Sequence, residues 1–212
     1  AIPDTISNNQ FIFHQVSSTG VGYAAYLDST SSTTTANINF SIISGSNSIT
    51  AAAEVNKGSF SHICMQYDSR PASKTATILS GSKQIGSSQR FSFNSIDTSG
   101  NPLLIATGSE IIIDTSAFTP THTFSGSINN FRMFHDTRAA ADVERYIKRD
   151  IFPEANSNLI LNLRFNEATG SYKNNDIVLD HSGQSLHSRV SNYTNTMRDE
   201  KPYSTLCEFE KS

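Results

Sequence analysis

Residues 36–43, Ala36-Asn-Ile-Asn-Phe-Ser-Ile-Ile43, alternate apolar and polar side chains with a period of two. Ile38, Phe40 and Ile42 fall on one side of an extended chain, and the polar residues between them fall on the other side. The alternation therefore predicts a β-strand with one face in a hydrophobic core.

Segments of the same kind recur at short intervals on both sides of this one. Strands are predicted at Gln10–Gln15, Gly22–Leu27, Ala36–Ile43, Ser48–Val55, Ser59–Tyr67, Lys74–Leu79, Arg90–Phe93, Leu103–Thr107, Glu110–Asp114, Ser127–Phe134, Leu159–Phe165, Asp176–Leu179, Leu186–Val190 and Ser204–Phe209. One segment, Thr137–Arg149, has apolar residues at helical spacing instead, with Thr137 as a candidate N-cap. Many short strands with one short helix predict an all-β, two-sheet antiparallel sandwich.

Composition and net charge exclude several classes of protein. The chain has 212 residues, of which 36% are hydrophobic and 17% charged, while 33 Ser and 20 Thr supply much of the polar content. A net charge of -3 disfavours nucleic-acid binding, which needs a basic surface. No apolar stretch approaches the roughly 18 residues of a membrane helix, so no membrane insertion is expected. A helical bundle is also excluded.

Three stretches carry a resemblance to a known family. Residues 58–68, Gly58-Ser-Phe-Ser-His-Ile-Cys-Met-Gln-Tyr-Asp68, resemble a strand of laminin-G-like domains, and the His-Ile-Cys form looks most like pentraxins. Residues 124–134 resemble the closing strand of such domains. Residues 161–170 with 179–183 resemble the opening strand and its Asp-x-Ser-Gly turn. The resemblance implies a jelly-roll sandwich of the concanavalin A-like lectin/glucanase superfamily.

These motifs stand in an unusual order, because the opening motif follows the closing one. We expect residues 1–212 to form a single circularly permuted sandwich, with the middle and closing strands in 1–155 and the opening strands in 156–212. The alternative is a segment of a tandem array of such domains, which begins within one domain and ends within the next. Residue 1 is Ala, which predicts a processed product, an excised fragment or an engineered chain.

The cysteines and two N-glycosylation sequons indicate where in or outside the cell the protein is found. By the resemblance, Cys64 and Cys207 lie on neighbouring strands and form a disulfide; two reduced core thiols are the alternative. Asn39 and Asn192 begin the sequons Asn-Phe-Ser and Asn-Tyr-Thr. These features favour a secreted protein, or one on a cell or virion surface.

The sequence offers little support for an enzyme. Members that hydrolyse glucans carry two glutamates in an E-x-D-x-x-E strand, and this spacing is missing. Calcium is a candidate cofactor, because Glu110 matches the first residue of the pentraxin E-Q-D run, although two Ile follow it. Asp114 is a second candidate metal ligand. Further acids at predicted strand ends are calcium candidates or ordinary turn residues, namely Asp28, Asp68, Asp176 and Asp180.

Sugar binding usually needs an aromatic side chain for stacking, with polar groups around it. The candidate ligand-binding residues are Tyr23, Tyr172, Asn174 and Tyr193. We therefore expect a non-catalytic carbohydrate-binding or adhesion module with a glycan or protein ligand. A structural or assembly domain of a virion, fibre or large surface protein is the alternative. Pentraxins form rings, but no segment of this sequence identifies a subunit interface.

Overall fold

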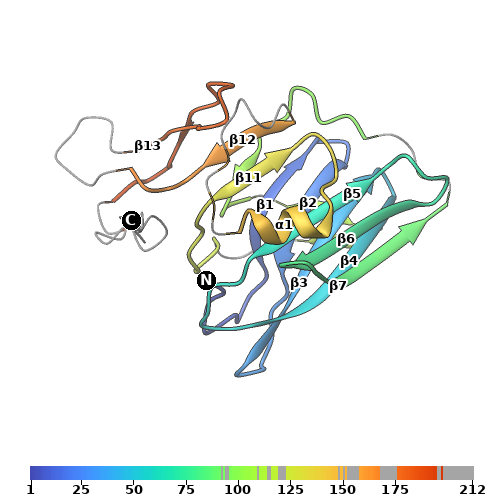
Figure 1. Cartoon of the computed structure of the whole chain (residues 1–212). Helices are drawn as coiled ribbons and strands as arrows, with labels where there is room; N and C mark the ends of the chain where they lie inside the picture. Colours follow the sequence, from blue (N-terminus) through green and yellow to red (C-terminus); the bar gives the residue numbers. More distant parts are fainter. Residues whose placement is uncertain are drawn as a thin grey trace. The chain divides into compact units, whose positions relative to one another are not determined.

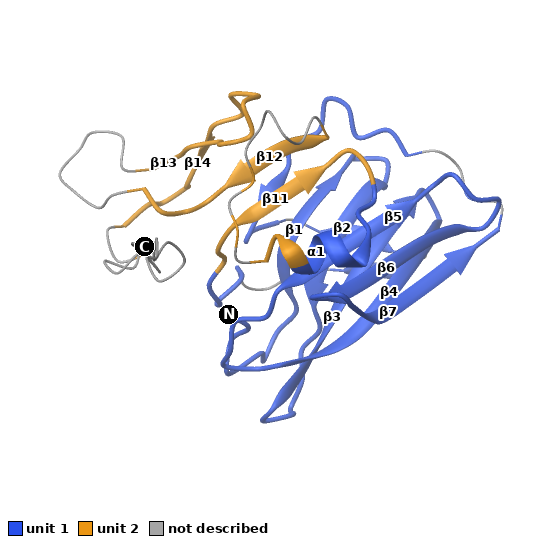
Figure 2. Ribbon diagram, viewed as in Figure 1, with its two compact units in different colours: residues 1–127, 137–144 blue, residues 128–136, 145–212 orange. Residues whose placement is uncertain are grey.

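The computed structural model describes residues 1–91, 93, 96–108, 110–113, 116–118, 123–147, 149, 151, 158–167, 176–194 and 197. Within these residues the regular secondary structure is almost entirely β-strand, with one α-helix, α1 (Ala140–Arg145) (Figure 1). No described helix has the length and hydropathy needed to span a bilayer. The chain forms two compact units (Figure 2): residues 1–127 and 137–144 make unit 1, and residues 128–136 and 145–212 make unit 2.

Unit 1 contains a five-stranded antiparallel sheet in the order β4-β3-β2-β1-β8. Its strands are β1 (Gln10–Val16), β2 (Val21–Leu27), β3 (Thr35–Ser44), β4 (Asn47–Asn56) and β8 (Leu104–Ile105). On β3 the predicted apolar face is confirmed, because Ile38, Phe40 and Ile42 are at most 6% exposed. The pairing of Ile38 with Leu27 and Ala53 sets the register of β2, β3 and β4.

A three-stranded antiparallel sheet packs against that face. It consists of β5 (Ile63–Asp68), β6 (Lys74–Ser80) and β7 (Lys83–Arg90), and β6 contacts both β3 and β4. Ala76 and Ile78 of β6 are fully buried in the shared core, against which Met65 and Tyr67 of β5 also pack. This arrangement confirms the predicted two-sheet antiparallel sandwich.

The opposite face of the five-stranded sheet is also partly covered. A hairpin of β9 (Ile111–Ile113) and β10 (Ser116–Phe118) contributes Ile111 and Phe118 to a second apolar cluster. The Phe118 ring lies 4.2 Å from that of Tyr26 and 5.0 Å from that of Phe11, measured between ring centroids. On this face of β3 the polar residues Asn39 and Ser41 are buried as well, whereas Asn37 is exposed.

His14 is an unusual member of this second face. It is only 4% exposed, and neither ring nitrogen has a hydrogen-bond partner among the described residues. Its ring lies 4.6 Å from that of Phe11, and Gly108 lies so close that a Cβ there would stand 2.6 Å from Nε2. Burial lowers the pKa of His14, because a charged imidazole would lose its hydration without gaining a partner.

We expect this histidine to make the fold acid-sensitive. Its stabilising contribution is complete above the ordinary pKa of about 6.5 and declines as the pH falls below it, by up to about 1.4 kcal/mol per pH unit. His14→Phe should flatten this part of the profile in urea unfolding measured between pH 7.5 and 5. His135→Phe, at an exposed position, is the control. Parallel profiles for the wild-type and His14→Phe chains would contradict this expectation.

Unit 2 contains two short antiparallel pairs. One joins β11 (Phe131–Phe134) to β12 (Leu159–Leu163), and the other joins β13 (Ile177–Val178) to β14 (Ser188–Arg189). Asp180 follows β13 and is 8% exposed. Its carboxylate accepts hydrogen bonds from the backbone N–H groups of Asn162 (2.9 Å), Ser182 (2.9 Å) and Leu186 (3.0 Å), and from the Ser182 hydroxyl (2.7 Å). The Asp-x-Ser-Gly turn is thus a hydrogen-bonded structural element.

Two predicted elements need correction. The strand expected at 90–93 is instead β7, Lys83–Arg90, which was missed because Ile85 is its only large apolar side chain. The helix is shorter than predicted, and its first turn starts from the Ala139 carbonyl, which accepts bonds from the N–H groups of Asp142 and Val143. Thr137 is therefore not the N-cap. The strand predicted at 204–209 lies outside the described residues.

Candidate functional site: a polar pocket on the three-stranded sheet

The outer face of the β5-β6-β7 sheet carries polar side chains because of strand alternation. On β6 the core takes Ala76 and Ile78, so Thr75 and Thr77 point the other way. The register places Gln66 of β5 opposite Thr77, and Asp68 opposite Thr75. On β7, Gln84 pairs with Leu79. The result is a patch of hydroxyl, amide and carboxylate groups on a rigid antiparallel sheet.

The segment that leads into α1 stands beside this patch and turns it into a pocket. The backbone N–H of Arg138 donates a 2.5 Å hydrogen bond to Oε1 of Gln66. Arg70, just beyond β5, donates from Nη2 to the Thr137 hydroxyl at 2.8 Å. These two bonds attach the segment to the sheet at two points.

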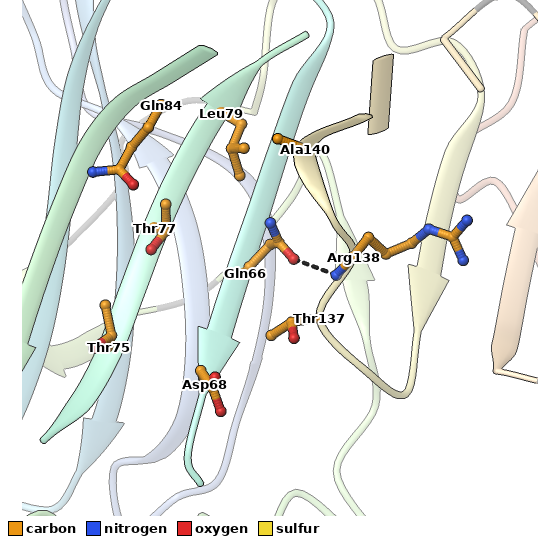
Figure 3. A pocket seen from close by; sticks show the side chains of 9 residues that line it. All are labelled: Gln66, Asp68, Thr75, Thr77, Leu79, Gln84, Thr137, Arg138 and Ala140. Carbon is orange, nitrogen blue, oxygen red and sulfur yellow. Dashed lines mark hydrogen bonds between the residues drawn. The ribbon is translucent and has the colours of Figure 1, made fainter. Parts of the chain in front are cut away.

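The pocket has a volume of about 340 Å³, at the lower end of the range for small-molecule sites. Its nine lining side chains are Gln66, Asp68, Thr75, Thr77, Leu79, Gln84, Thr137, Arg138 and Ala140 (Figure 3). None of these nine is aromatic, and Leu79 is the largest apolar one. The lining can therefore donate and accept hydrogen bonds, but it offers no ring for stacking.

An internal ion pair occupies the only carboxylate of this lining. Arg70 donates from Nε to Oδ1 of Asp68 at 3.0 Å and from Nη2 to Oδ2 at 3.1 Å, and the Arg70 backbone N–H adds a third bond to Oδ1. The hydrogen bonds from the Arg70 side chain, followed by its backbone N–H, hold the pKa of Asp68 below its ordinary value. Asp68 is thus an ionised, paired carboxylate.

The described lining of the pocket does not hold the pair of carboxyl groups that a glycoside hydrolase uses. Glycoside hydrolysis uses two carboxyl groups roughly 5–9 Å apart, whereas the described lining holds one, already bound to a guanidinium. Cys64 lies on the same face of β5, and burial raises the pKa of its thiol to about 11, an effect that the positive charge of Arg138 partly offsets. At neutral pH this thiol is protonated, so it is a poor nucleophile.

The predicted ligand-binding tyrosines do not form this pocket. Tyr23 is largely buried rather than exposed: its hydroxyl donates to Oε1 of Gln15 at 2.5 Å, and its ring meets Phe13 edge-on. Burial raises its pKa to about 12. Tyr193, in unit 2, is partly buried and does not line the pocket. Tyr172 and Asn174 lie outside the described residues.

Several of the candidate calcium ligands accept hydrogen bonds from other groups of the protein. Asp28 accepts a 2.8 Å bond from Nδ2 of Asn39, Asp176 pairs with Arg189 at 2.9 Å, and Asp180 is surrounded by donors. A carboxylate enclosed by N–H and O–H donors, as Asp180 is, has a poor environment for a cation. Glu110 is exposed, and Asp114 lies outside the described residues. The described part of the chain contains no group of three or more His, Cys, Asp or Glu that could hold a metal ion.

The modification sites differ in accessibility. Asn39 is 6% exposed and its amide is bonded to Asp28, so the folded strand leaves no room for a glycan there. Asn192 is exposed on a turn and is the better placed sequon. Cys64 is free of any disulfide to a described residue, and Cys207 lies outside the described residues, so the Cys64–Cys207 disulfide stays a prediction.

The two facing antiparallel sheets of unit 1 define a β-sandwich with a polar pocket on one outer face. A laminin G-type family model, described as the concanavalin A-like lectin/glucanases superfamily, matches residues 2–144. Because the match spans more than half of the chain, this chain belongs to that superfamily. The match includes the stretches 58–68 and 124–134, whereas the opening-type motif at 161–183 lies beyond it. No curated protein and no solved structure gives a significant match.

Proposed function

We propose that this chain is a non-catalytic carbohydrate-binding module, and that the pocket on the β5-β6-β7 sheet binds the glycan. The observation that carries the proposal is the lining itself, where Gln66, Thr77 and Gln84 present amide and hydroxyl groups from a rigid sheet. Such groups match the paired donors and acceptors of sugar hydroxyls. Membership of a superfamily of lectin-type sandwiches supports the same function.

A module of this kind acts where glycans are displayed, so we place it on an extracellular, cell or virion surface. Laminin G-like domains are often extracellular, and the exposed sequon at Asn192 fits that location. The open, polar pocket suits weak binding of individual sugars, which display of several copies on one surface would strengthen.

A glycan array probed with the purified chain tests this proposal, once with calcium and once with EDTA. We expect binding in both conditions, because the pocket's described lining uses neutral polar groups and one paired carboxylate. Binding that EDTA abolishes would point instead to a calcium-dependent site elsewhere on the chain.

Substitutions locate the site. For the best glycan of the array, the double variant Thr77→Val, Gln84→Ala should bind about 10-fold or more weakly in titration calorimetry, because two hydrogen-bonding groups of about 1 kcal/mol each are lost. Gln89→Ala is a matched control, since Gln89 is exposed on β7 opposite Thr75 but does not line the pocket. Equal losses in the two variants would refute this location.

The alternative is an assembly domain that contacts other proteins. Large apolar side chains are exposed in several separate segments, including Phe60 at 51% and Phe91 at 70%. If no glycan binds under either condition, Phe91→Ser with a measurement of oligomeric state by light scattering becomes the relevant experiment. Loss of an oligomer in that variant would support assembly.

A further inference from the structure

Resting on the proposed function, we infer that the pocket selects neutral glycans, bound through their hydroxyl edges, over glycans carrying carboxylate or sulfate groups. The inference follows from where the charges of the pocket lie and how they are used.

The charges at the rim cancel within the protein. Asp68 and Arg70 form a bidentate pair, with distances of 3.0 and 3.1 Å, so each ion already has its counter-ion. A further N–H of Arg70, also on Nη2, goes to the hydroxyl of Thr137, on the segment that leads into α1 and forms the wall of the pocket. An acidic sugar that approached the Nε and Nη2 edge of Arg70 would have to displace Asp68 or Thr137.

The one cation of the described lining, Arg138, contributes its backbone N–H to the pocket rather than its charge. The N–H of Arg138 is bonded to Gln66, and the Arg138 side chain extends away from Thr75, Thr77 and Gln84 (Figure 3). Its positive charge is close enough to Cys64 to lower the pKa of that thiol against the effect of burial. The floor that a ligand meets is therefore built from neutral hydroxyl and amide groups.

The side-chain types of the lining determine which part of a sugar the pocket can bind. None of the nine lining side chains is aromatic, so the apolar face of a pyranose has no ring to stack on. The ligand surface that this floor can recognise is a row of hydroxyl groups. Uncharged hexose-rich glycans present such rows without the cost of desolvating an ionic group.

The test compares neutral oligosaccharides with their uronic-acid, sialylated and sulfated counterparts on one array, in 50 mM and 500 mM NaCl. We expect the neutral members to bind, with affinities that change less than about 2-fold with salt, since no ion pair to the ligand forms. Preference for the acidic members, with binding lost at 500 mM NaCl, would overturn the inference.

A charge variant tests directly whether Asp68 neutralises the positive charge of Arg70. Asp68→Asn removes the partner of Arg70, so we expect the ratio of acidic to neutral glycan binding at 50 mM NaCl to rise about 3-fold or more. Asp97→Asn makes the same change in net charge at an exposed position outside the lining and should leave the ratio unchanged. An unchanged ratio in Asp68→Asn, or equal rises in both variants, would contradict the cancellation.

The outcomes separate the two proposals. If acidic glycans bind more tightly than neutral ones and the Thr77→Val, Gln84→Ala variant loses that binding, the pocket is the glycan site and only the proposed selectivity is wrong. If acidic glycans bind more tightly and the double variant binds them as well as the wild-type chain does, both the proposed location of the site and its proposed selectivity are wrong. If no glycan binds in either salt, both proposals fall together.

Discussion

Asp180→Asn is expected to lower the free energy of unfolding of unit 2 by about 2–4 kcal/mol. The carboxylate accepts four hydrogen bonds while 8% exposed, and an amide in its place has one oxygen and an NH₂ group that faces donors. At least one buried N–H then has no acceptor, which is costly because the group has also lost its water. Hydrogen exchange of residues 176–190 under increasing urea measures this loss locally.

The same residue gives a pH signature. Burial alone would raise the pKa of Asp180, but the hydrogen bonds from Ser182, Asn162 and Leu186 outweigh it, so the pKa lies below its ordinary value of 3.8. The ionised form is thus favoured by folding. Its contribution is complete above the ordinary pKa and is lost as the pH falls below it. In Asp180→Asn this part of the acid-induced loss should disappear.

Asp176→Asn is the matched control in the same unit. Its carboxylate pairs with Arg189, whose side chain is 68% exposed, and exposed pairs contribute about 0–1 kcal/mol. Similar losses in the two variants would show that the burial and four bonds of Asp180 do not stabilise the turn as argued.

Gly22→Ala should cost about 2–6 kcal/mol and leave little folded unit 1 at moderate urea concentrations. A Cβ at this position would stand 1.9 Å from the Gln15 carbonyl oxygen and 2.8 Å from the Val16 Cα, both backbone atoms of the paired strand β1. The φ of +151° is also one that alanine rarely adopts. Backbone strain and overpacking each cost about 1–3 kcal/mol, and β1 cannot move away without losing its register.

Gly45→Ala separates these two causes. Gly45 has a φ of +65°, but nothing lies within 4 Å of a Cβ built there. The variant therefore carries only the conformational cost of a left-handed residue, about 1–2 kcal/mol. Urea unfolding followed by circular dichroism compares the two. A Gly22→Ala loss no larger than that of Gly45→Ala would contradict the steric argument.

Strands with clean alternation were predictable from the sequence. Residues 36–43 gave the core face of β3, because Ile38, Phe40 and Ile42 have only one way to reach a common core. β7 was missed because an edge strand needs few apolar contacts, and Gln84 and Gln89 look like loop residues in isolation. The burial of Asn39 and Ser41 was also unpredictable, since β9 and β10 cover that face from a distant part of the chain.

The site was only half accessible to prediction. Once β5 and β6 are recognised, alternation puts Gln66 and Thr77 on one outer face, and this signal could have found the floor of the pocket. The wall of the pocket, which is the segment leading into α1, could not be found in this way. Its residue Thr137 resembled a helix N-cap, and no neighbouring residue in the sequence indicates its hydrogen bond with Arg70. For Tyr23 the sequence did not indicate that its hydroxyl and its ring would both have partners inside the fold.

The order in which the chain is made has a consequence for this pocket. The bond from Arg138 to Gln66 spans 72 positions, and that from Arg70 to Thr137 spans 67. A nascent chain that has emerged only as far as residue 127 carries every strand of the floor but none of the wall. The complete pocket therefore forms only late in biogenesis, and under the proposed function we expect a glycan resin to retain full-length chains but not chains truncated at residue 127.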